Sequence, residues 1–212
     1  MSVTISRLYN DYETASAVVT DLEAAGLPYA EISMVSSNAD NWYKAKKAAT
    51  NGKIDRDADG ADDRVEGAGA GAGIGAVLGG GAGLLAGLGL MAIPGIGPVV
   101  AAGWLVATAA GAVAVGAAGG IVGALSQTGV SKEDAEIYAE GVRRGGTLVT
   151  ARVSDGNSAR YEKIMDTSAV NIRDRRAAYR KTGWNRFEDA ALPYSAEQVR
   201  NEREMYSRVS AP

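Results

Sequence analysis

Two hydrophobic patterns follow each other at the start of the chain. Apolar and polar residues alternate over residues 3–8, as they do in a half-buried strand. Helical spacing follows, with apolar residues at Ala15, Val18, Val19, Leu22 and Ala25. Asn10 or Asp11 can cap this helix and Gly26 can end it. With a second strand over 31–37, residues 1–37 predict a β-α-β unit.

The same order of elements is predicted over residues 131–173. Ser131 and Asp134 fit a capping box at the start of a helix, which the glycines after Arg144 can end. A strand over 147–153, a short helix over 157–169 and a fourth strand over 169–173 complete this half. Two β-α-β halves commonly close into a ferredoxin-like α+β sandwich, so we predict that fold, interrupted by a long insertion.

The most unusual part of the insertion is a glycine- and alanine-rich stretch without a charge, from Gly67 to Ser131. Small residues four apart lie on one stripe of a helix. The stripe glycines are Gly67, Gly71, Gly75, Gly79, Gly83 and Gly87 in a first arm, and Gly103, Gly111, Gly116 and Gly120 in a second. The turn between the arms is Pro94, Gly95, Gly97 and Pro98. We therefore predict a helical hairpin over residues 67–130.

Such a hairpin needs a partner for its glycines. Each glycine costs a helix about 1 kcal/mol relative to alanine, which close packing against another helix can offset. The other faces are apolar nearly all round, so both arms must be buried. The hairpin could span or bind a membrane, form the shared core of a soluble homo-oligomer, or fold back onto its own domain, which is small for that task. The first two alternatives both predict self-association.

An acidic linker, residues 38–66, precedes the uncharged stretch. Its carboxylates fit the spacing of an EF-hand calcium loop, with Asp55, Asp57, Asp59, Asp63 and Glu66 as the candidate ligands. Against this interpretation, Asp62 occupies a position that is normally apolar, and the preceding residues are a poor entering helix. A solvated acidic linker is the alternative.

The C-terminal tail, residues 174–212, is highly charged and has few aliphatic residues. A capping box at Ser195 and Gln198 predicts a helix over about residues 196–208. The tail cannot fold alone, so we expect it to pack on the domain or on a neighbouring subunit. The basic residues over 173–181 could contact anionic lipid headgroups or form a solvated or inter-subunit face.

Composition argues against catalysis. The chain of 212 residues has no Cys and no His, which removes thiol catalysis, His-ligated metals and the usual general base at neutral pH. The net charge of −3 gives no preference for nucleic acid. The N-terminal residues do not fit a signal peptide. We predict a non-enzymatic protein without a cofactor, Ca²⁺ apart, in the cytoplasm or at the inner face of the cytoplasmic membrane.

Three pieces of sequence suggest a family. "AEISMVSS", "IPGIGPVVAAG" and "AEIYAEGVRRGGTLV" together resemble the general stress protein 17M-like (heat-induced stress protein) domain family over residues 3–173. The resemblance implies a bacterial, stress-associated role with no established enzymatic activity. It leaves open a self-assembling scaffold, at a membrane or in solution, and a sensor module that responds to a small ligand or Ca²⁺.

Overall fold

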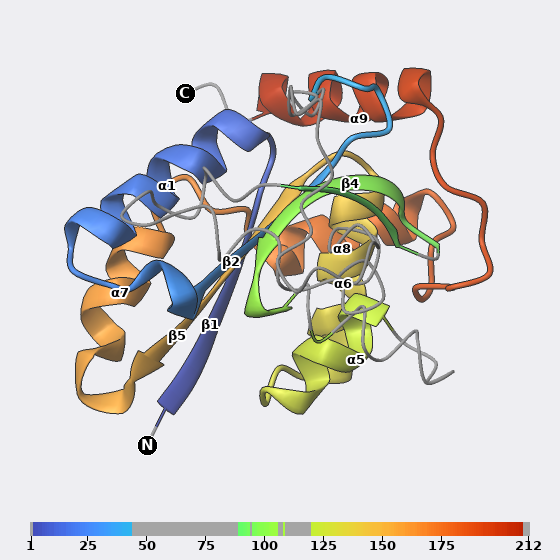
Figure 1. Cartoon of the computed structure of the whole chain (residues 1–212). Coiled ribbons are helices and arrows are strands. Elements are labelled where there is room, and N and C mark those ends of the chain that lie inside the picture. Colours follow the sequence, from blue (N-terminus) through green and yellow to red (C-terminus); the bar gives the residue numbers. More distant parts are fainter. Residues whose placement is uncertain (1, 44–88, 94, 106–107, 109–119, 210–212) are drawn as a thin grey trace, which may run out of the picture.

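The computed structural model describes residues 2–43, 89–93, 95–105, 108 and 120–209. These residues form an α+β domain around one antiparallel sheet (Figure 1). The strand order is β1-β5-β2-β4-β3. The strands are β1 (Ser2–Tyr9), β2 (Ile32–Ser37), β3 (Gly89–Ile93), β4 (Gly97–Gly103) and β5 (Thr147–Ser154). The α+β class is therefore confirmed.

The first β-α-β unit forms as predicted. Helix α1 (Tyr12–Ala24) is capped by Asp11, whose side chain accepts from the backbone N–H of Thr14 at 2.7 Å. The helix stops before Gly26, which has a φ of +90°. Strand β5 lies antiparallel between β1 and β2, so the unit is split by a strand from the second half of the chain.

The second half also begins as predicted. Ser131 caps helix α6 (Lys132–Arg143) by accepting from the backbone N–H of Asp134 at 3.1 Å. Strand β5 follows, and then helix α7 (Ser158–Met165), which buries Tyr161 and Met165. Short 3-10 turns, Tyr29–Glu31 and Asp155–Asn157, precede β2 and α7.

The fourth strand predicted over 169–173 is wrong. The backbone N–H of Val170 donates to the carbonyl of Leu8 at 2.8 Å, so this segment does reach the free side of β1. Pairing ends there because Asn171 caps the next helix, α8 (Ile172–Lys181), through the N–H groups of Arg173 and Asp174. The side-chain cap of Asn171 thus begins a helix where the sequence pattern predicts a strand.

The helical hairpin predicted over 67–130 is wrong over residues 89–93 and 97–103, which form strands. Strands β3 and β4 pair antiparallel around the predicted turn, with Ile93 opposite Gly97. β4 continues the sheet beside β2. Val99 and Ala101 point to the core on one face and Ala102 to the other, which is the period of a strand. Of the described residues after β4, Trp104, Leu105 and Thr108 are helical, as is α5 (Gly120–Gln127).

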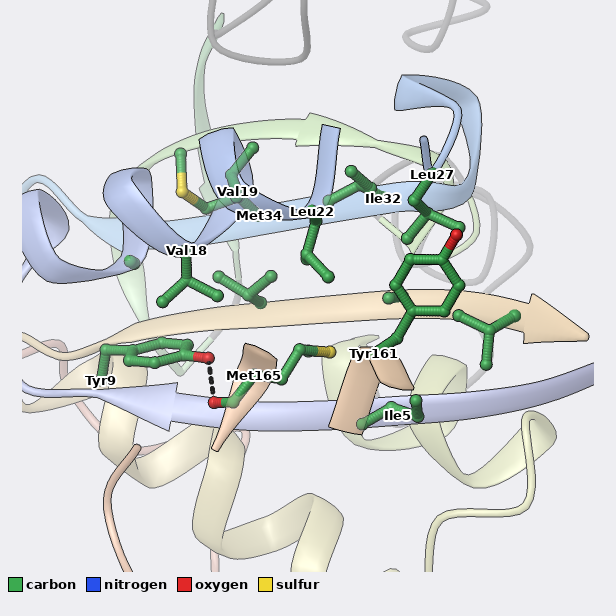
Figure 2. Packing of buried hydrophobic residues seen from close by; sticks show 14 of the residues in the cluster. Ile5, Tyr9, Val18, Val19, Leu22, Leu27, Ile32, Met34, Tyr161 and Met165 are labelled. Atoms are coloured by element: carbon green, nitrogen blue, oxygen red, sulfur yellow. Dashed lines mark hydrogen bonds between the residues drawn. The ribbon is translucent and has the colours of Figure 1, made fainter. Parts of the chain in front are cut away.

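Each face of the sheet has its own core. Helices α1 and α7 cover one face, where Tyr9 is fully buried and its hydroxyl donates to the Met165 carbonyl at 2.6 Å (Figure 2). Helices α5 and α6 cover the other face together with residues of β3 and β4 (Figure 1). Apolar residues of the uncharged segment are thus buried in their own domain, namely Ile93, Ile96, Val99 and Leu105.

The tail packs on the domain, as predicted. Tyr179 of α8 and Trp184 are buried with Ile137 of α6 in a third cluster. Helix α9 (Ala196–Val209) begins at the predicted capping box, in which Ser195 and Gln198 exchange hydrogen bonds of 2.8 and 3.3 Å. α9 crosses one end of the sheet (Figure 1), and Val199 is its fully buried apolar contact.

Candidate functional site

Many of the predicted site residues lie outside the residues that the structure describes. This holds for the calcium candidates Asp55, Asp57, Asp59, Asp63 and Glu66, for the glycines from Gly67 to Gly87, and for Pro94, Gly111 and Gly116. Over the described ranges, no group of acidic residues is arranged to hold a metal ion. The calcium loop and the glycine stripe remain predictions.

The remaining glycines have local roles. Gly95 and Gly97 take positive φ in the β3–β4 turn, and Pro98 lies in β4. Gly103 ends β4 with a φ of +95°, and a Cβ there would lie 2.6 Å from Cα of Ser33. The predicted close backbone approach at Gly103 is therefore present, but the neighbour is strand β2 rather than a helix. Gly120 begins α5.

The strongest concentration of charge in the described structure lies between α6 and the C-terminal segment. Glu140 of α6 is fully buried. Its carboxylate contacts Nη2 of Arg143 and Nε of Arg144, both at 2.6 Å. The spacings i,i+3 and i,i+4 place all three side chains on one side of the helix. Arg144 reaches further to Glu202 of α9 at 3.1 Å, so the cluster joins the two helices.

Aromatic rings surround these guanidinium groups. Arg144 lies 4.1 Å from the ring centre of Tyr179 and 5.4 Å from that of Tyr194. Arg143 lies between the rings of Tyr194 and Phe187, at 5.4 and 5.5 Å. Cation–π contacts of desolvated arginines are the stronger kind. The rings come from the tail, so tail packing and charge burial depend on each other.

Burial shifts the pKa of several groups in the cluster. The Glu202 pKa is raised because its carboxyl is partly desolvated, although Arg144 opposes the rise. Burial also raises the pKa of the Tyr179 hydroxyl. Burial lowers the pKa of Arg144, but Glu140 and Glu202 outweigh it, and the net shift is upward. Arg144 therefore stays charged, and its contacts hold segments together rather than exchanging protons.

A second set of contacts ties α9 to the points where the chain enters and leaves the sheet. Arg203 donates to the carbonyl of Gly145 at 2.8 Å, to that of Ser37 at 3.1 Å and to the Asp40 carboxylate at 2.5 Å. The loop before α9 packs closely on the β3–β4 turn. A Cβ on Gly95 would lie less than 3.0 Å from Asp189, and a Cβ on Gly97 less than 3.0 Å from Pro193. The C-terminal segment thus contacts the start of the insertion, the β3–β4 turn within it and the turn between α6 and β5.

Sequence reasoning missed most of this site. From the sequence, Arg144 is placed only at the end of a helix, and Glu202 and Arg203 only in the predicted helix over about 196–208. The available signal was the helical spacing of Glu140 to Arg143 and Arg144.

Two of the basic residues in 173–181 have separate partners in the structure. Arg176 forms an ion pair with Asp134 at 2.7 Å, and Arg175 donates to the side chain of Asn10 at 2.5 Å.

Two further findings bear on function. Within the described ranges, no helix is long and apolar enough to cross a membrane. Comparison with family models, with curated proteins and with solved structures gave no match.

Proposed function

We propose that this protein is a non-enzymatic stress-response protein that self-assembles through its uncharged segment, residues 67–130. The observation that supports assembly best is strand β3. In the described part of the sheet, β3 pairs only with β4 and forms an edge. Gly89, Leu90 and Ala92 are exposed there, with Leu90 at 46%. An exposed apolar edge strand is a template for pairing with another chain.

The position of this edge links it to the glycine-rich sequence. Residues 67–88, all uncharged, lead directly into β3. The assembling surface of the proposal therefore combines the edge of β3 with the glycines that precede it, in place of the full helical hairpin. The proposed stress association rests on the family resemblance. The proposed non-catalytic role rests on the same resemblance and on the absence of Cys and His from the sequence. The split β-α-β arrangement supports a variant of the ferredoxin-like fold.

Two settings for assembly remain, a soluble particle and a cytoplasmic particle bound to the membrane surface. Two spanning helices around the Pro94–Pro98 turn do not fit β3 and β4, which occupy the sheet. We favour the soluble particle, because Ile93, Ile96 and Val99 of the segment are buried in its own domain. Fractionation of expressing cells at neutral pH tests this choice, followed by a carbonate wash of the membrane pellet. The soluble particle is expected in the first supernatant. A particle that sediments with the membrane and is released only by carbonate would contradict it in favour of the membrane surface.

The edge itself is tested by Leu90→Lys. A charge on an exposed edge blocks strand pairing, so we expect the variant to sediment as a smaller species than the parent chain. Leu192→Lys is the matched control, because Leu192 is 88% exposed but lies in the C-terminal segment. Equal particle sizes for the parent and Leu90→Lys would remove β3 from the proposed interface.

A further inference from the structure

The two edges of the described sheet, β1 and β3, differ in how their outward backbone groups are used. The Leu8 carbonyl of β1 accepts from the backbone N–H of Val170 at 2.8 Å, so the Leu8 backbone faces outward. Alternate residues of a strand direct their backbone groups to the same side, so Ser6 faces outward too. Its carbonyl accepts from the hydroxyl of Tyr138 at 2.8 Å and from Nη1 of Arg7 at 2.9 Å. Both of these carbonyls are therefore occupied within the chain.

Side chains also protect the β1 edge. Arg7 forms an ion pair at 2.6 Å with Asp166, which follows α7. Charged side chains at an edge are a common protection against strand pairing. A strand added along β1 would have to displace both the buried Tyr138 and the backbone of Val170. β1 is therefore a closed edge.

The pairing of β4 shows which backbone groups of β3 are free. The Pro98 carbonyl accepts from the backbone N–H of Asn38 at 2.8 Å, so the even-numbered residues of β4 face β2. The odd-numbered residues of β4 therefore face β3, where their partners are odd-numbered as well. Leu90 and Ala92 thus turn their N–H and C=O groups outward. Within the described ranges, neither residue has a backbone partner on that side.

The free edge of β3 is complementary to a second copy of itself. When two β3 strands run antiparallel about a two-fold axis beside Met91, Leu90 of each copy lies opposite Ala92 of the other. These are hydrogen-bonded pairs, in which each outward N–H and C=O group finds a partner. The sequence of β3, GLMAI, has no charge, so identical strands do not repel each other. The exposed side chains of Leu90 and Ala92 lie on one face, where they pack across the two strands.

We propose that β3 pairs antiparallel with β3 of a second copy, with Met91 of the two chains directly opposite. This inference rests on the proposed self-assembly and defines its geometry. Because both chains use the same surface, the contact is isologous and closes at a dimer. Pairing of β3 with β1 would instead continue from chain to chain, but the closed edge of β1 prevents it. Growth beyond a dimer requires a different surface, such as the glycines of residues 67–88.

Disulfide cross-linking measures this register, because the chain has no Cys of its own. Leu90→Cys and Ala92→Cys are oxidised separately and as an equal mixture, and both positions are exposed, so the core is unchanged. In the mixed dimer the two substituted positions lie opposite each other with Cα atoms about 5.5 Å apart, which suits a disulfide. Identical positions are offset by two residues and lie more than about 7 Å apart. We expect the mixed disulfide to form at least about tenfold faster than either homodimer.

Thr4→Cys tests the alternative pairing of β3 with β1, because Thr4 faces outward from β1 as Ser6 does. A mixture of Thr4→Cys with Leu90→Cys should cross-link no faster than Leu90→Cys alone. Faster cross-linking of this mixture would show that β1 is an open edge, and would overturn the closed dimer.

Sedimentation velocity of the parent at the same concentration separates failure of this inference from failure of self-assembly. If the parent is larger than a monomer but Leu90→Cys and Ala92→Cys cross-link no faster together than apart, the register is overturned and self-assembly stands. A monomeric parent overturns both, and is the result expected if residues 44–88 of the same chain cover β3.

Discussion

Arg203 of α9 donates to the Asp40 carboxylate at 2.5 Å and so joins the last helix to the residues that follow β2. In the sequence, Asp40 lies near the N-terminus and Arg203 near the C-terminus. The same guanidinium also contacts the carbonyls of Ser37 and Gly145. One side chain therefore holds α9, the β2 exit and the α6–β5 turn together.

Replacing Arg203 should loosen α9 without unfolding the sheet. Arg203→Gln removes the charge from three contacts, and α9 has Val199 as its only fully buried apolar anchor in the described structure. We expect amide hydrogen exchange in α9 to become about tenfold faster while β5 keeps its protection. Arg200→Gln on the exposed side of the same helix is the control. Similar exchange in both variants would show that Arg203 does not hold the helix.

The buried carboxylate of Glu140 should matter more than any single surface charge. Glu140→Gln leaves Arg143 and Arg144 buried with less compensation, so we expect a loss of about 3 kcal/mol in the free energy of unfolding. Urea denaturation measures it. Glu133→Gln, on the exposed face of α6, should change stability by less than about 0.5 kcal/mol. If Glu140→Gln lost as little stability as Glu133→Gln, the ion pairs of Glu140 would not be what holds the C-terminal segment on the domain.

Glu202 predicts a pH dependence. Its folded pKa is raised by burial, so its protonated form is favoured in the folded state. Its contribution is therefore complete below the unfolded pKa and is lost as pH rises through the folded pKa. At neutral pH the ionised Glu202 should therefore make the parent less stable than Glu202→Gln, and this deficit should shrink as pH falls toward the ordinary carboxyl pKa. Urea denaturation at several pH values measures it, with Glu197→Gln as the exposed control. A difference that grows on acidification would contradict the sign.

The sequence patterns were most reliable where one short signal decided the structure. Caps at Asp11, Ser131 and Ser195 marked helix starts correctly, because each cap bonds an N–H only a few residues away. Gly26 marked a helix end for an equally local reason.

The uncharged segment misled the prediction because glycine and alanine carry little information about period. The stripe that includes Gly103 favoured a helix there, but residues 97–103 form a strand because β2 supplies the hydrogen bonds. The ion cluster could not be found either, because Glu202 and Tyr194 meet α6 only through the tertiary fold.

Gly103 provides a matched test of the strand assignment. Gly103→Ala combines a positive φ with a clash against the β2 backbone, whereas Gly129→Ala has a similar φ, +91°, and open space. We expect a cost of about 1 kcal/mol at Gly129 and at least about 2 kcal/mol more at Gly103. Thermal or urea unfolding compares the two variants. Equal costs would mean that β4 does not approach β2 as closely as the structure has it.

Sedimentation velocity of the full chain tests self-assembly most directly. The parent, the double variant Gly75→Leu/Gly79→Leu and the control Ala76→Leu, which lies off the spacing of four, are compared at one concentration. The account predicts a particle larger than a monomer for the parent and the control, and a smaller species for the double variant. A monomeric parent, or a double variant of unchanged size, would contradict assembly through the uncharged segment.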